Sequence, residues 1–257
     1  VNEGARLNIG QGVTVKFSTG TGMYVRGILD AQGSQTGRIV ITSASSGPLP
    51  GSWREILFQG AGANGSRMSY CDVSYGGDGA YIAPGGIWHH ALGNIAVLGC
   101  SPQFENCTFS QSGNSAFFGL DGCQASINQC QFTNSPVGIR LAGSAYHQHI
   151  TTPLPIRSSV VTNNGLAASC SAEAAGAFAS NNTVTGNTRN ACEIYGGHFQ
   201  TGVTWRTMNG SPVWYLTGDV YCDEGGALNI EAGGCVKLQE CSLYSRGIVT
   251  AAGTQAN

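Results

Sequence analysis

One six-residue pattern constrains the fold of this chain more than any other sequence feature. The pattern reads apolar-x-x-(Cys, Ser or Asn)-x-apolar, and its last apolar positions are 36, 23, 29 and 23 residues apart. A pair of alternating apolar residues and a turn rich in Gly and Asn follow each copy. Short strands that recur at such spacings are typical of a solenoid, in which each copy forms one coil. The copies end at Val73, Phe109, Phe132, Val161 and Val184.

The period-two alternation predicts an all-β fold whose apolar side chains face the interior of the coils. No long segment has the 3.6-residue period of a helix, and at most a short helical turn fits residues 166–177. The fourth position of the pattern should form a column in which small polar side chains bond one another or a turn carbonyl. We interpret this column as structural; its members are Cys71, Cys107, Cys130, Ser159 and Asn182.

A longer repeat relates the two ends of the sequence. Residues 224–255 repeat the pattern of residues 3–35 with one gap, and the chain contains no linker or low-complexity segment. We therefore predict a single domain over residues 1–257 that ends in the phase in which it began. The matching pairs include Leu7 and Leu228, Ile9 and Ile230, Lys16 and Lys237, Tyr24 and Tyr244, and Ile28 and Ile248.

Several segments resemble the right-handed parallel β-helix repeat proteins that bacteria and archaea secrete or display on their surfaces. The resemblance implies a parallel β-helix of about ten or eleven coils, each of roughly 23 residues. It implies little about function, because lyases, hydrolases, tailspikes, adhesins and surface-layer proteins share this architecture. The segments are residues 7–17, 27–33, 39–43, 50–58, 68–77 and 213–220.

Two insertions interrupt the repeats, at about residues 74–94 and 142–155. Long loops on a regular scaffold often carry function, so both insertions are candidate ligand or interface loops. Each contains a histidine pair, but no carboxylate accompanies the second pair, and we predict neither a metal site nor a cofactor. The candidate residues are Trp88, His89, His90, Tyr146, His147 and His149.

The acidic residues are scattered over different coils and form no cluster of the kind that calcium-dependent lyases require. Asp72 and Glu105 are the one pair that could approach the carboxylate spacing of a glycoside hydrolase. We predict that the protein is not an enzyme, with a carbohydrate-active lyase or hydrolase as the remote alternative. A glycan-binding adhesin module is the nearer alternative, because aromatic rings can stack on sugars; the tryptophans are Trp53, Trp88, Trp205 and Trp214.

The amino-acid composition limits the classes of partner and the cellular locations that fit this protein. The net charge is −2 and only 10% of residues are charged, which argues against nucleic-acid binding. No run of 18 apolar residues is present, so we predict no membrane span. Ten cysteines, without zinc-type or haem-type spacing, favour an oxidising compartment, and we predict an extracellular or cell-surface protein. A chain that starts at Val1 fits a processed product.

The cysteine spacing predicts one disulfide. Cys100 and Cys123 occupy the same turn position of neighbouring coils, about 4.8 Å apart, which is within the range that a disulfide accepts. Cys107 and Cys130 follow seven residues later on strands, where parallel side chains suit the bond poorly. We therefore predict a Cys100–Cys123 disulfide, with Cys107 and Cys130 reduced.

The matching ends suggest self-assembly. A surface at one end that fits a different surface at the other gives a head-to-tail contact, which does not close and so propagates a fibre. We predict an extracellular structural protein whose copies form a surface layer, sheath or filament; a longer tandem polypeptide or a lone monomer is the alternative. The cysteines that could form bonds at the last coils are Cys222, Cys235 and Cys241.

Overall fold

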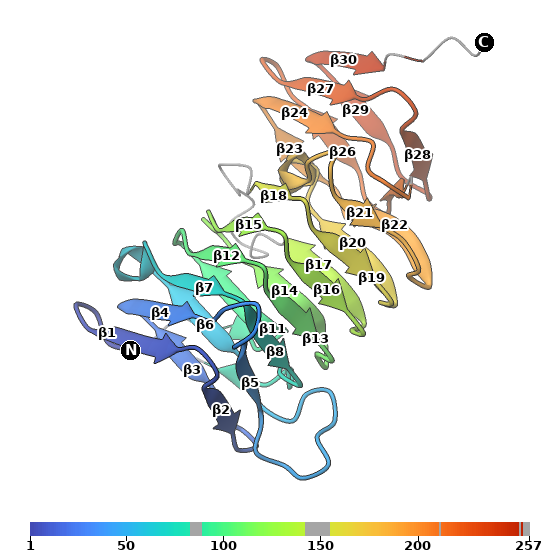
Figure 1. Cartoon of the computed structure of the whole chain (residues 1–257). Coiled ribbons are helices and arrows are strands. Elements are labelled where there is room, and N and C mark those ends of the chain that lie inside the picture. The colour runs from blue at the N-terminus through green and yellow to red at the C-terminus, as the bar shows by residue number, and fades with distance from the viewer. Residues whose placement is uncertain (83–88, 142–154, 211, 252, 254–257) are drawn as a thin grey trace.

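The computed structural model describes residues 1–257 except 83–88, 142–154, 211, 252 and 254–257. Parallel strands stack coil upon coil, from β1 at one end to β30 at the other (Figure 1). Sheet A contains β1 (Arg6–Gly10), β4 (Ile28–Gln32), β7 (Arg67–Ser69), β12 (Gln103–Glu105), β15 (Ser126–Asn128) and β18 (Ile156–Arg157). Sheet B contains β2 (Thr14–Phe17), β5 (Ile39–Ser43), β8 (Cys71–Ser74), β13 (Thr108–Ser110), β16 (Gln131–Thr133), β19 (Val160–Thr162) and β21 (Thr183–Val184).

Sheet C is the longest and runs through almost the whole stack. Its nine strands mark nine successive coils, and two further strands begin another, close to the number expected from the sequence. The strands are β3 (Met23–Val25), β6 (Ile56–Gln59), β11 (Gly93–Leu98), β14 (Ser115–Gly119), β17 (Val137–Leu141), β20 (Leu166–Cys170), β22 (Arg189–Ile194), β25 (Val213–Leu216) and β28 (Cys235–Leu238).

Two three-stranded sheets complete the C-terminal coils. Sheet D contains β23 (Gly197–Phe199), β26 (Val220–Cys222) and β29 (Leu243–Ser245). Sheet E contains β24 (Gly202–Trp205), β27 (Ala227–Ile230) and β30 (Ile248–Ala251). In the described residues, helical structure is limited to single 3-10 turns, η1 (Ala61–Ala63) and η3 (Ala174–Ala177). The second turn lies in the segment for which the sequence allowed a short helix.

Inward side chains from the sheets form one continuous apolar core. Phe104 of β12 makes edge-to-face contacts with Phe109 of β13 and Phe117 of β14, so one ring joins sheets A, B and C. Farther along the stack, the Trp205 and Trp214 rings lie 6.0 Å apart and fill the interior of the last coils. The alternation in the sequence thus sets which side chains are buried.

Turns with left-handed backbone connect sheet A to sheet B. The turn residues are Tyr70, Asn106, Gln129 and Ser158, whose φ angles lie between 49° and 53°. The residue that follows each of these turn residues is a member of the polar column predicted from the sequence. The structure confirms that this column is structural. Ser159 Oγ accepts from the Cys130 amide at 3.1 Å, and Asn182 Oδ1 accepts from the Ser159 amide at 3.0 Å.

A second polar column follows the left-handed turns between sheets B and C, and the sequence reading missed it. The Ser112 amide donates to Ser135 Oγ, the Ser135 amide to Asn164 Oδ1, and the Asn164 amide to Asn187 Oδ1, at 3.0–3.1 Å. These turns take positive φ at Gln111, Asn134, Asn163 and Gly186. A signal was present, because the four column residues are 23, 29 and 23 positions apart.

The two copies of the long repeat form the same strand pairs on different faces of the coil. Leu7 of β1 pairs with Leu29 of β4, and the matching Leu228 of β27 pairs with Val249 of β30. However, β2 lies in sheet B while its counterpart β28 lies in sheet C. The last coils therefore repeat the local geometry of the first coils, but each repeated strand lies on the next face of the coil.

Candidate functional site

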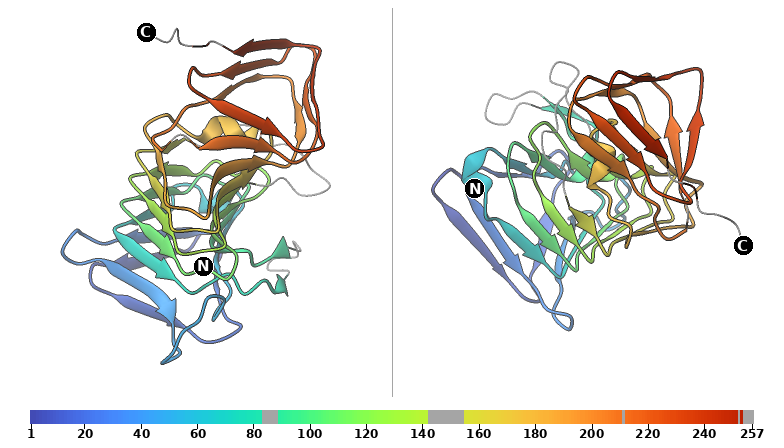
Figure 2. Two further views of the ribbon diagram at one scale, coloured as in Figure 1. Left: turned by 90° about the vertical axis from the view of Figure 1, so that its right-hand side faces the viewer. Right: turned by 90° about the horizontal axis from the view of Figure 1, so that it is seen from above.

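The first insertion contains a hairpin that projects from the side of the stack (Figure 2). Its strands, β9 (Tyr81–Ile82) and β10 (His89–His90), are antiparallel, and the His90 ring lies 4.9 Å from that of Tyr81. His90 Nδ1 is 3.1 Å from the Gly79 carbonyl oxygen. Within the described residues, no group of three or more His, Cys, Asp or Glu could hold a metal ion. The other predicted loop residues, Trp88, Tyr146, His147 and His149, lie outside the described residues.

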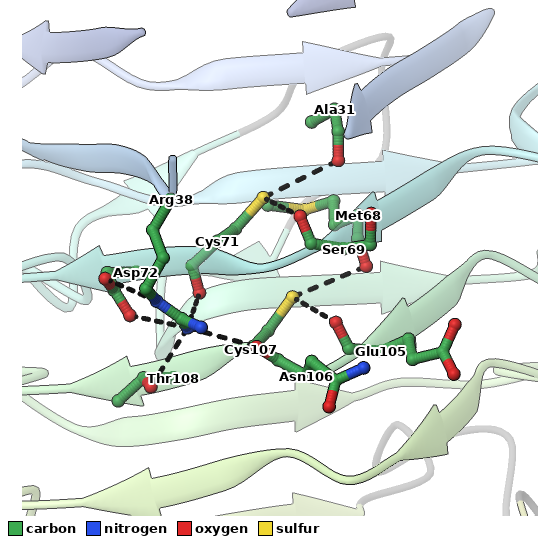
Figure 3. Close-up of polar contacts among 10 residues, drawn as sticks. All are labelled: Ala31, Arg38, Met68, Ser69, Cys71, Asp72, Glu105, Asn106, Cys107 and Thr108. Atoms are coloured by element: carbon green, nitrogen blue, oxygen red, sulfur yellow. Dashed lines mark hydrogen bonds and ion pairs between the residues drawn. The ribbon is translucent and has the colours of Figure 1, made fainter. Parts of the chain in front are cut away.

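An arginine holds Asp72, the first member of the predicted carboxylate pair (Figure 3). Arg38 Nε and Nη2 donate to the two Asp72 oxygens at 2.8 Å each. Nη2 also reaches the carbonyl of Asn106 at 3.0 Å, so the guanidinium clamps two neighbouring coils. The hydrogen bond to Asp72 raises the pKa of Arg38 above its ordinary value. Asp72 therefore belongs to a structural ion pair.

Glu105 does not share a row with Asp72. Asp72 of sheet B stacks against Thr108, whereas Glu105 of sheet A stacks against Ser69. The two carboxylates therefore lie in different sheets, and the turn between the sheets separates their rows.

Three of the four tryptophan rings are buried and therefore cannot stack on sugars. Trp53, Trp205 and Trp214 are at most 1% exposed. Trp53 stacks on Phe17 at 4.6 Å and donates from Nε1 to the Ser74 carbonyl at 2.8 Å. These three rings are core residues, and Trp88 is outside the described residues.

Thiols of the first polar column bond carbonyl oxygens at the end of the preceding strand in sheet A (Figure 3). Cys71 Sγ donates to Ser69 O at 3.4 Å, and Cys107 Sγ to Glu105 O at 3.3 Å. Cys130 repeats the contact with Asn128 O at 3.3 Å. Each thiol is thus satisfied inside the coil and acts as part of the scaffold.

The comparison with protein families agrees with this geometry. The model of the right-handed β-helix region matches residues 2–152 and 58–206, which together cover most of the chain. The chain belongs to the right-handed β-helix family. No curated protein and no solved structure matches it. In this β-helix, none of the described helices is long and apolar enough to cross a membrane.

All ten cysteines of this β-helix are free thiols in the structure. Cys100 and Cys123 are buried, and burial raises the pKa of each thiol to about 12. A disulfide between them is absent here and stays a prediction from the sequence. With such a pKa, both groups are neutral thiols at pH 8, so oxidation and alkylation of either one are slow in the folded state.

We expect alkylation of the native protein with iodoacetamide at pH 8 to modify Cys235 first and Cys241 more slowly. Cys235 is exposed and Cys241 is half-buried, whereas the other eight thiols are buried. Mass spectrometry after unfolding without reductant then counts the remaining thiols. Ten alkylated cysteines agree with the structure, and a count of eight with Cys100 and Cys123 unmodified would instead establish the predicted disulfide.

The predicted end-coil cysteines differ in environment. Cys222 is buried beneath β29 and β30, and its Sγ lies 3.7 Å from the Ile248 carbonyl oxygen. Cys241 Sγ donates to Leu216 O at 3.3 Å. Cys235 is exposed and pairs in register with Val213 on sheet C. Of the three, Cys235 has the most accessible thiol.

A ladder of aromatic rings runs along the outer face of sheet D. His198, Tyr221 and Tyr244 are in register, with ring centroids 4.2 and 4.8 Å apart and interplanar angles of 4° and 9°. Asp223 accepts from His198 Nδ1 at 3.0 Å. The stacked rings cover one another's faces, and Tyr244 is 48% exposed at the end of the ladder. The ladder therefore leads toward the last coil surface.

Proposed function

We propose that this β-helix is an extracellular structural protein whose copies stack end to end into a filament, sheath or surface layer. The observation that supports this proposal is the position of the exposed apolar side chains. Among the described residues, nine large hydrophobic side chains are exposed, and six of them lie on the first or last coils. The six are Leu7, Val13, Leu238, Tyr244, Ile248 and Val249.

The strand edges at these coils support the same proposal. Each of β1, β2, β3, β28, β29 and β30 has a strand partner on one side only among the described residues. Free strand edges with apolar side chains favour pairing with another strand. Ile248 is 67% exposed, whereas the matching Ile28 is half-buried in a strand that has partners on both sides. A second copy would cover Ile248 in the same way.

The rotated repeat limits how two copies fit together. Because β28 occupies a different face from its counterpart β2, the next copy should be turned about the long axis rather than stacked in the same orientation. A contact between different surfaces with a fixed rotation generates a helical filament. The exposed Cys235 thiol is available for disulfide bonds between copies. The proposed extracellular location rests on the number of cysteines in the sequence.

Sedimentation tests this function. We expect the wild-type chain to form oligomers whose size grows with concentration, and the double variant Ile248→Lys/Val249→Lys to stay monomeric because it places two charges at the free edge. Leu49→Lys is the matched control, since Leu49 is 71% exposed but lies on the loop between β5 and β6. A wild-type chain that stays monomeric in reducing and oxidising buffer would contradict the proposal.

A further inference from the structure

Three cysteines of the first polar column lie one above another inside the stack. The residues that directly follow them, Asp72, Thr108 and Gln131, are in register on β8, β13 and β16. Each of these strands has a partner on both sides, so the proposed end-to-end contacts leave the row unchanged. The row consists of Cys71, Cys107 and Cys130.

The three side chains point in the same direction. Each Sγ donates to the carbonyl oxygen two residues before it, at 3.3–3.4 Å, and each cysteine is at most 2% exposed. Because the contact repeats on all three coils, the sulfurs of neighbouring coils keep the strand spacing of about 4.8 Å. Parallel thiols at this spacing are poorly placed for a disulfide, and all three are free. The interior thus holds soft sulfur ligands at a regular spacing.

This spacing fits one metal ion between two sulfurs. An ion at the midpoint lies about 2.4 Å from each sulfur, close to the length of roughly 2.3 Å for metal–thiolate bonds. Zinc does not fit, because it takes four ligands, and no group of three or more His, Cys, Asp or Glu in the described residues could hold a metal ion. Thiolates select soft ions such as copper(I), and two opposed thiolates are sufficient for a closed-shell monovalent ion.

A positive charge lies next to the first two thiols. Arg38 Nη2 is 3.3 Å from the Cys71 carbonyl oxygen and 3.0 Å from that of Asn106, the residue before Cys107 (Figure 3). The hydrogen bond to Asp72 is the largest cause of the raised pKa of Arg38, and negative charge on either thiol acts in the same direction. Two thiolates and one monovalent ion carry a net charge of −1. Arg38, which Asp72 shares, offsets part of that charge.

Cys107 is the central ligand of the row, because it has a cysteine on each side. Burial acts to raise the pKa of Cys107, but hydrogen bonds from Cys130 and Cys71 lower it well below its ordinary value. A thiol that loses its proton more readily is the better metal ligand. The two outer thiols are two strand spacings apart, about 9.6 Å, which is too far for one ion to bridge. Each possible pair therefore includes Cys107.

We propose that Cys107 and one of its two neighbours bind a single soft monovalent cation, of the copper(I) class, as a linear dithiolate. The ion forms two metal–sulfur bonds, and each of the two thiols releases a proton to solvent. The oxidation states of the ion and of the sulfurs stay the same. The site lies within one chain and does not depend on the assembly of copies.

Serine variants test the shared ligand. Serine already occupies this column at Ser159, so replacing a thiol with a hydroxyl should preserve the fold, which circular dichroism checks. Copper(I) is titrated in the absence of oxygen against a chromogenic copper(I) chelator. We expect Cys71→Ser and Cys130→Ser each to keep one tightly bound ion, because each retains a pair of thiols. Cys107→Ser should bind about a hundredfold more weakly, since it leaves no pair.

Two controls separate this site from the other thiols of the chain. All variants also carry Cys235→Ser and Cys241→Ser, which remove the exposed and the half-buried thiol. Cys123→Ser is the matched control, since Cys123 is equally buried but lies outside the row. The proposal is overturned if Cys107→Ser loses no affinity, or if Cys123→Ser or either outer variant loses as much as Cys107→Ser.

X-ray absorption of the copper-loaded protein measures the ligands directly and does not depend on the folding of a variant in the row. The chain again lacks the Cys235 and Cys241 thiols. We expect two sulfur neighbours and no nitrogen or oxygen neighbour. Three or more sulfur neighbours, or displacement of copper(I) by an equal concentration of zinc, would overturn the linear site.

Discussion

Replacing Phe104 with alanine should lower the free energy of unfolding by about 3–5 kcal/mol, the usual cost of removing a buried phenylalanine. Its side chain is 1% exposed, and its ring makes edge-to-face contacts at 5.6–5.8 Å with Phe58, Phe109 and Phe117. The ring contacts residues of sheets B and C while it is anchored in sheet A. The cavity would therefore remove contacts that join the three faces of the coil.

Urea unfolding followed by circular dichroism measures this loss. Tyr81→Ala is the matched control, because it also deletes an aromatic ring but at a site that is 59% exposed. Exposed substitutions change stability by roughly 0.5 kcal/mol or less. Similar losses in both variants would contradict the packing described for Phe104. Because coils contact only their neighbours, a broadened transition would show that the damage stays local.

The sequence predicted the parts of the fold that depend on local repetition. Alternation of period two sets which side chains face inward, and the recurring fourth position places Cys71, Cys107 and Cys130 in one column. Both properties are local: side chains alternate along each strand, and the same left-handed turn recurs before each column residue. The family, the parallel strands and the first polar column were therefore predictable.

Features that depend on distant side chains were not predictable. Arg38 bonds Asp72 across a coil whose length no local pattern sets, so the sequence did not show that this carboxylate is held in an ion pair. The inward orientation of Trp205 likewise depends on the change from sheets A and B to sheet E, which the repeat alone does not reveal.

Replacing Asn164 with aspartate should destabilise the protein by about 3–5 kcal/mol near neutral pH, because it leaves a charge buried without a partner. Asn164 is 2% exposed in the middle of the second polar column. Its Nδ2 donates to the carbonyl oxygens of Phe132 and Thr162 at 3.0 Å each, and its Oδ1 accepts from the Ser135 amide. A carboxylate keeps the acceptor but points a second negative oxygen at two carbonyls.

The loss should depend on pH in a defined direction. Burial and the facing carbonyls disfavour the charged form, so the pKa of the new carboxyl in the folded state should lie above about 3.9, its value in the unfolded chain. Below that value the group is protonated in both states, and its hydroxyl can donate to one of the two carbonyls. As the pH rises through the folded-state pKa, the unfolded state ionises more readily, and stability falls by up to about 1.4 kcal/mol per pH unit.

Unfolding of the wild type and the variant at several pH values separates this effect from ordinary damage to the fold. Asn164→Leu is the control, since it has similar size and removes the same hydrogen bonds without adding a charge. Its loss relative to the wild type should be about 2–4 kcal/mol, the penalty for buried polar groups without partners, and should not change with pH. The loss in Asn164→Asp should be smaller at acidic pH than at neutral pH. A loss that is the same at both pH values would mean that water reaches the carboxylate, and that the column is not sealed inside the coil.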